Sequence, residues 1–76
     1  MKAITTIILN KSVWKPTRVK AFDMDNNWTC IDYDFALDSK GNQEKAAYAL
    51  IKKMNWNGKV IGGEVEEGKY VWVFTD

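Results

Sequence analysis

Five aspartates between positions 23 and 38 are the side chains in this sequence with the clearest potential for chemistry. They are Asp23, Asp25, Asp32, Asp34 and Asp38. Paired carboxylates can bind Mg²⁺ or Ca²⁺, or share a proton. The sequence contains no histidine, so the usual general base at neutral pH and the commonest metal ligand are missing. We interpret the aspartates as solvated and charge-paired, with a hard-metal site as the alternative, and predict no catalytic residue, no metal and no cofactor.

Cys30 is the only cysteine, and no histidine is present to activate its thiol. Its place in a predicted strand favours an inert thiol in the core or in an interface. One cysteine cannot form an internal disulfide, so a reducing compartment fits the chain best. The apolar start of the chain ends at Asn10-Lys11 without a small-residue cleavage site, which favours a first strand over a signal peptide. We therefore expect a cytoplasmic protein.

A basic stretch with an aromatic residue inside it could bind single-stranded nucleic acid by charge and stacking. Its residues are Lys11, Trp14, Lys15, Arg18 and Lys20. A solvated lysine loop beside a hairpin explains the same residues. The formal net charge of +1 and the single arginine argue against nucleic acid as the main partner. Binding of single-stranded nucleic acid is therefore kept as an alternative function.

The aromatic residues carry the strongest functional signal, because they make up 13% of the chain and include four tryptophans. Burial of large rings in a small core is one explanation. The last predicted strand, however, is apolar on both sides, with Tyr70, Trp72 and Phe74 on one side and Val71 and Val73 on the other. Such a strand must be central in its sheet or must face a partner.

One helix can cover only one face of a sheet, so one apolar set is left with little cover from the chain itself. The candidates are one side of the last strand and a patch of Phe22, Met24, Trp28 and Cys30. Exposed apolar patches mark interaction sites, and tryptophan and tyrosine are frequent hot-spot residues. We predict a partner-binding surface anchored by Phe22, Met24, Trp28, Tyr70 and Trp72. A curled sheet that wraps its own second face is the alternative.

The elements that position these residues follow from periodicity and turn chemistry. Residues 4–9 are apolar on both faces, which is typical of an interior strand, and residues 10–17 form a loop. Residues 18–35 read as a hairpin that turns at Asp25-Asn26-Asn27.

The register of this hairpin can be predicted from charge. A three-residue loop sets Lys20 opposite Asp32 and Arg18 opposite Asp34, whereas a two-residue loop loses both pairs. We therefore predict the three-residue loop. In that register one face carries Val19, Ala21, Ile31, Tyr33 and Phe35, and the opposite face carries Phe22, Met24, Trp28 and Cys30.

A helix follows, with Asn42 as the predicted N-cap and Asn57-Gly58 as the predicted C-terminal stop. Its apolar stripe is Ala47, Leu50, Ile51 and Met54.

The chain then forms a second hairpin that turns at Glu67-Gly68. In its first strand, Gly62-Gly63 favours a β-bulge, with a close approach by Trp72 or by a partner as the alternative. The pattern therefore predicts one α+β domain over residues 1–76: a single, mostly antiparallel sheet of about five strands (β-β-β-α-β-β) with one helix packed on one face.

The C-terminal half, from Gln43-Glu44-Lys45-Ala46-Ala47 through Gly58-Lys59-Val60 to the run from Val65 to Val73, places a lysine-bearing helix before a glycine-containing hairpin. In this it resembles some small phage-encoded anti-CRISPR proteins. The resemblance implies stoichiometric binding to a host complex and no turnover, and it carries over no functional residue by position.

The leading hypothesis is a small non-catalytic binding protein, encoded by a phage or mobile element, that inhibits a host defence complex in the host cytoplasm by occupying a surface. A single-stranded nucleic-acid-binding protein and a structural homodimer are the alternatives. We expect no membrane partner and no enzymatic activity.

Overall fold

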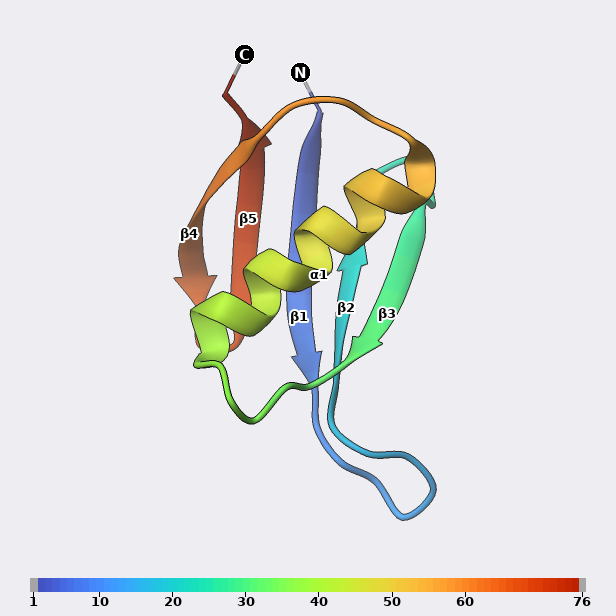
Figure 1. Cartoon of the computed structure of the whole chain (residues 1–76). Coiled ribbons are helices and arrows are strands. Elements are labelled where there is room, and N and C mark those ends of the chain that lie inside the picture. Colours follow the sequence, from blue (N-terminus) through green and yellow to red (C-terminus); the bar gives the residue numbers. More distant parts are fainter. Residues whose placement is uncertain (1, 76) are drawn as a thin grey trace.

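The structure, a computed structural model, describes residues 2–75, which form five strands and one helix (Figure 1). The elements are β1 (Ala3–Leu9), β2 (Arg18–Phe22), β3 (Trp28–Asp32), α1 (Ser39–Met54), β4 (Val60–Glu66) and β5 (Lys69–Phe74). The strands form one antiparallel sheet in the order β3-β2-β1-β5-β4, and α1 crosses one face of it. The predicted α+β fold is confirmed.

β1 lies at the centre of the sheet, between β2 and β5. Ile4 lies opposite Trp72 on β5, and Ile8 lies opposite Val19 on β2. A strand with neighbours on both edges is shielded from water along its backbone and suits β-branched residues on both faces. The prediction of an interior strand at the start of the chain is confirmed.

The apolar core lies between α1 and the sheet. From α1 it receives the predicted stripe, with Ala46 added and Met54 only partly buried. The sheet contributes Ile4, Val19, Ala21, Val60 and Trp72. The alternate residues of these strands point away from α1, because side chains along a strand alternate between the two faces.

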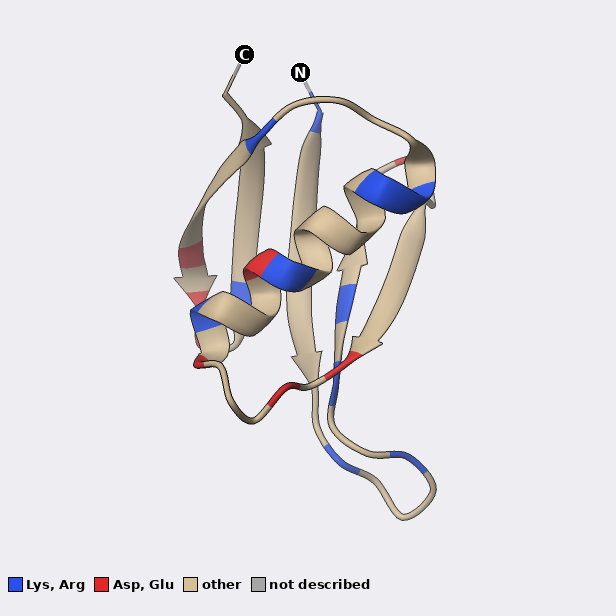
Figure 2. Ribbon diagram, viewed as in Figure 1, with Lys and Arg blue, Asp and Glu red and all other residues tan. Residues whose placement is uncertain are grey.

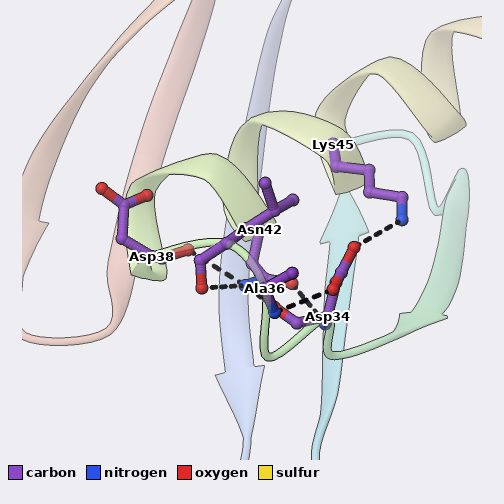
Figure 3. Close-up of polar contacts among 6 residues, drawn as sticks. Asp34, Ala36, Asp38, Asn42 and Lys45 are labelled. Atoms are coloured by element: carbon purple, nitrogen blue, oxygen red, sulfur yellow. Dashed lines mark hydrogen bonds and ion pairs between the residues drawn. The ribbon is translucent and has the colours of Figure 1, made fainter.

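α1 begins earlier than predicted. Asp38 is its N-cap, and the Asp38 Oδ1 accepts a hydrogen bond from the N–H of Gly41 at 2.7 Å. The predicted N-cap, Asn42, is a fully buried residue inside the helix. Its Oδ1 accepts from the Asp34 N–H at 2.7 Å and its Nδ2 donates to the Asp34 carbonyl at 2.9 Å (Figure 3). The prediction was wrong because this side chain fixes the β3–α1 connection.

The C-terminal end of α1 also differs from the prediction. Asn55 takes the left-handed conformation with φ of 58°, and its N–H donates to the carbonyl of Lys52 at 3.1 Å. The helix therefore closes two residues before Asn57-Gly58.

The register of the first hairpin is shifted by two residues from the predicted one. Lys20 lies opposite Cys30, and Arg18 lies opposite Asp32, so neither predicted charge pair forms across the strands. The loop is longer because the Asp23 carboxylate accepts hydrogen bonds from the N–H groups of Asp25 and Asn27 and from the Asn27 side chain (2.9–3.0 Å). A shift of two residues leaves every strand side chain on its predicted face.

The second hairpin turns at Glu67-Gly68 as predicted, and Gly68 has a φ of 76°. Its bulge lies between Glu64 and Glu66, not at Gly62-Gly63. Gly62 is instead the point where Trp72 packs on the backbone, because a Cβ at this position would lie 2.3 Å from the indole. The alternative reading of Gly62, a close approach by Trp72, is therefore correct.

Candidate binding surface

The sheet face turned away from α1 has no second layer over it in the part of the chain that the structure describes (Figure 1). We call it the open face. It is formed by Ala3, Thr5, Ile7, Leu9, Arg18, Lys20, Phe22, Trp28, Cys30, Asp32, Ile61, Gly63, Glu66, Lys69, Val71 and Val73. Each of these residues is half-buried or exposed, and none is fully buried.

Apolar side chains cross the open face from one sheet edge to the other. Cross-strand pairs place Trp28 beside Phe22, Phe22 beside Thr5, and Thr5 beside Val71. Val73 and Ile61 form the adjoining pair on β5 and β4. We call Ala3, Phe22, Trp28, Ile61, Val71 and Val73, together with Thr5 between them on β1, the apolar strip. Trp28 is 51% exposed and Ile61 63% exposed, so both ends of the strip are open to a partner.

Two lysines flank Trp28 at the β3 end of the strip. The Lys20 Nζ lies 5.4 Å from the centre of the Trp28 ring and 5.5 Å from that of Phe22. The Lys53 Nζ, from the last turn of α1, lies 5.3 Å from the Trp28 ring and donates to the Trp28 carbonyl at 2.6 Å. We call Lys20, Phe22, Trp28 and Lys53 the Trp28 corner. Its charge is positive, and its rings are the largest side chains on the open face.

The five predicted anchors divide between the two faces and a loop. Phe22 and Trp28 lie on the open face, and Met24, 99% exposed, lies in the loop that joins β2 and β3. Trp72 is 1% exposed, with its Nε1 bonded to Thr6, and Tyr70 stacks on it at 5.6 Å on the α1 side. Trp72 is therefore a core residue and Tyr70 packs with it, so neither lies on the open face.

Sequence reasoning missed part of this surface. The sequence identifies Val71 and Val73 only as the other side of the last strand, yet theirs is the side that stays uncovered. Their alternation with Trp72 along β5 shows that they share one side of the strand. The residue types alone, however, favour the side of Tyr70 and Trp72 as the binding side. Lys53 could not be assigned to the site, because its contact with Trp28 is created by packing of the helix against β3.

The predicted basic loop lies apart from the Trp28 corner. The chain between β1 and β2 projects beyond the end of the sheet (Figure 1), and Trp14 within this loop is 89% exposed. Figure 2 shows basic residues on both arms of the loop, and Lys11 and Lys15 lie on either side of Trp14 in the sequence. Arg18 lies opposite Asp32, and Lys20 contacts the rings of the Trp28 corner. The five residues are therefore not one cluster.

Four of the five aspartates, Asp23, Asp25, Asp34 and Asp38, have a hydrogen-bonding or ion-pair partner within residues 2–75. The Asp23 side chain is 2% exposed and lies 3.6 Å from the Lys2 Nζ. Burial of the Asp23 carboxyl works to raise its pKa, but hydrogen bonds from Asn27 and Asp25 and the charge of Lys2 outweigh burial, and the pKa lies below its usual value. Asp34 pairs with Lys45 at 3.6 Å (Figure 3). Within residues 2–75, no three His, Cys, Asp or Glu side chains are grouped as metal ligands.

Comparison with protein-family models, with curated proteins and with solved structures finds no match to this chain. Within residues 2–75, α1 is too short and too polar to span a bilayer.

Proposed function

We propose that this chain is a small non-catalytic binding protein that acts by placing its open face against a protein partner. The uncovered apolar strip is the observation that carries the proposal. Water contact along such a strip is unfavourable by roughly 25 cal/mol for each Å² of apolar surface, so a partner that covers it gains free energy. The face takes side chains from all five strands, and a surface of that breadth suits a macromolecule better than a small ligand, which prefers a concave pocket.

Trp28 is the expected centre of that contact. Tryptophan is enriched among residues whose truncation weakens protein interfaces most, and such residues pack beside other apolar groups within a polar rim. Trp28 has Phe22 on one side and lysines around it.

A phage or mobile-element inhibitor of a host defence complex, acting in the host cytoplasm, is the specific form of this proposal. Gly68 and Trp72, two of the residues that carry the resemblance to anti-CRISPR proteins, occupy a turn and the core. The resemblance therefore concerns the framework of the domain, and the partner must be identified by experiment.

The direct experiment is affinity capture from bacterial lysate with three immobilised proteins: wild type, Trp28→Ala and Trp14→Ala. We expect one host protein or complex to be held by wild type and by Trp14→Ala and to be lost with Trp28→Ala. Equal retention by Trp28→Ala, with its fold intact by circular dichroism, would remove the open face as the binding surface.

Single-stranded nucleic acid at the β1–β2 loop is the second candidate, favoured by the exposure of Trp14 between two lysines. It predicts binding of a fluorescent thymidine oligonucleotide that weakens steeply with salt and is lost in Trp14→Ala. If the oligonucleotide does not bind, or binds equally well at all salt concentrations, nucleic-acid binding by this loop is refuted.

A further inference from the structure

We propose that the part of the partner that docks at the Trp28 corner is an acidic protein segment, with carboxylates that bind Lys20 and Lys53 while an apolar side chain covers Trp28. This inference rests on the proposed function and specifies the chemistry of the partner. Two observations support it: both ammonium groups are held beside the Trp28 ring, and neither pairs with a carboxylate within residues 2–75.

The fold brings the two lysines together from different elements. Lys20 extends from the middle of β2, and Lys53 extends from the last turn of α1 (Figure 2). Both ammonium groups lie within 5.5 Å of the Trp28 ring centre, a distance at which the ring quadrupole attracts a cation. The hydrogen bond from Lys53 to the Trp28 carbonyl fixes this arrangement further. The charges are therefore positioned before any partner arrives.

Neither ammonium group has a carboxylate partner among residues 2–75. The ion pairs there use other lysines: Lys2, Lys45 and Lys69. An ammonium group has three N–H donors. Lys53 uses one of its three to donate to the Trp28 carbonyl. Two positive charges therefore stand beside an exposed apolar surface with donors to spare, which is complementary to carboxylates next to an apolar side chain.

The same geometry favours a protein segment over a nucleic acid. The two ammonium groups make one compact positive site beside a single ring, and a carboxylate can bind each of them where it is. Farther along the open face the charges alternate in sign, because Asp32 lies opposite Arg18 and Glu66 pairs with Lys69 at 3.5 Å. A longer polyanion would find no continuous positive track there. The corner therefore fits a short acidic segment.

The experiment uses two fluorescent peptides of equal length, one alternating Glu and Leu and the other alternating Gln and Leu, titrated by anisotropy against the intact chain. We expect the Glu peptide to bind about tenfold more tightly than the Gln peptide, and the double variant Lys20→Gln/Lys53→Gln to lose that advantage. The control variant Lys40→Gln/Lys59→Gln changes the net charge equally but away from the corner, and it should still bind the Glu peptide more tightly than the Gln peptide. Equal binding of the two peptides, or tighter binding of a thymidine oligonucleotide in competition, would overturn the inference.

Capture from lysate with the same double variant separates the two proposals. Loss of the partner with Trp28→Ala, but full retention with Lys20→Gln/Lys53→Gln in both low and high salt, would refute the acidic segment alone. Retention with Trp28→Ala would instead refute the proposed function.

Discussion

The indole Nε1 of Trp72 donates a hydrogen bond to the Oγ1 of Thr6 at 2.9 Å. The same hydroxyl donates to the Oε1 of Gln43 at 2.7 Å, so one oxygen links β5, β1 and α1. Thr6 and Gln43 are fully buried. The polar atom of Trp72 is therefore satisfied inside the core and needs no partner from outside the chain. The tryptophan on the open face is Trp28.

Replacing Thr6 by valine should destabilise the fold strongly. The variant keeps the volume of the side chain but leaves the Trp72 N–H and the Gln43 amide oxygen buried without their partner, at about 1–3 kcal/mol for each group. We expect Thr6→Val to lower the free energy of unfolding in urea by about 2–4 kcal/mol. Thr5→Val on the open face is the matched control and should change it by less than about 0.5 kcal/mol. Similar effects at the two positions would contradict the role of the buried hydroxyl.

Adjacent glycines in β4 should respond in opposite ways to alanine. A Cβ at Gly62 would lie 2.3 Å from the Trp72 ring, whereas a Cβ at Gly63 has no atom within 4 Å. Overpacking costs about 1–3 kcal/mol, so Gly62→Ala should lower the urea midpoint clearly. Gly63→Ala should leave the midpoint unchanged or raise it, because alanine reduces the freedom of the unfolded chain. A harmless Gly62→Ala would show that Trp72 does not pack there.

The two faces of the sheet could be read from alternation along the strands, since each strand side chain keeps the side that its position predicts. Which of the two faces α1 covers could not be predicted from the sequence. Trp72 and Val71 are both apolar, and only the packing of α1 decides which of them is buried. The hairpin register also escaped prediction, because charge pairs are worth little beside the three hydrogen bonds that Asp23 accepts. Lys53 could not be predicted as part of the site, because only the packing of α1 beside β3 brings it to Trp28.

Asp23 should make stability depend on acid pH. Its carboxyl has a pKa below the ordinary 3.8 in the folded state. The folded chain therefore binds this proton less readily than the unfolded chain, and the stabilisation is full above the unfolded pKa and is lost as the pH falls through the folded pKa. We expect Asp23→Asn to be less stable than wild type at pH 7, with a gap that narrows between about pH 5 and about pH 2. Urea titrations across that range measure the gap, and a gap independent of pH would contradict the assignment.

Truncation of two tryptophans should separate surface from core. Trp28 is 51% exposed and Trp72 1% exposed. Trp28→Ala should reduce the free energy of unfolding by about 1 kcal/mol or less, and Trp72→Ala by about 3–5 kcal/mol. Urea denaturation followed by circular dichroism makes the comparison. A Trp28→Ala variant that fails to fold would make Trp28 an ordinary core residue.

Three of the four tryptophans offer the most direct test of the open face, because Trp14 lies in the β1–β2 loop, Trp28 on the open face and Trp72 in the core. One ¹⁵N–¹H spectrum of the labelled chain, recorded with and without the captured partner, reports on all of their indole N–H groups. We predict that the Trp28 signal moves or broadens on binding, while the Trp14 signal stays in place. A change at Trp14 with none at Trp28 would contradict the account, and so would a Trp28 signal that moves with protein concentration alone, since it would make a second copy of the chain the occupant.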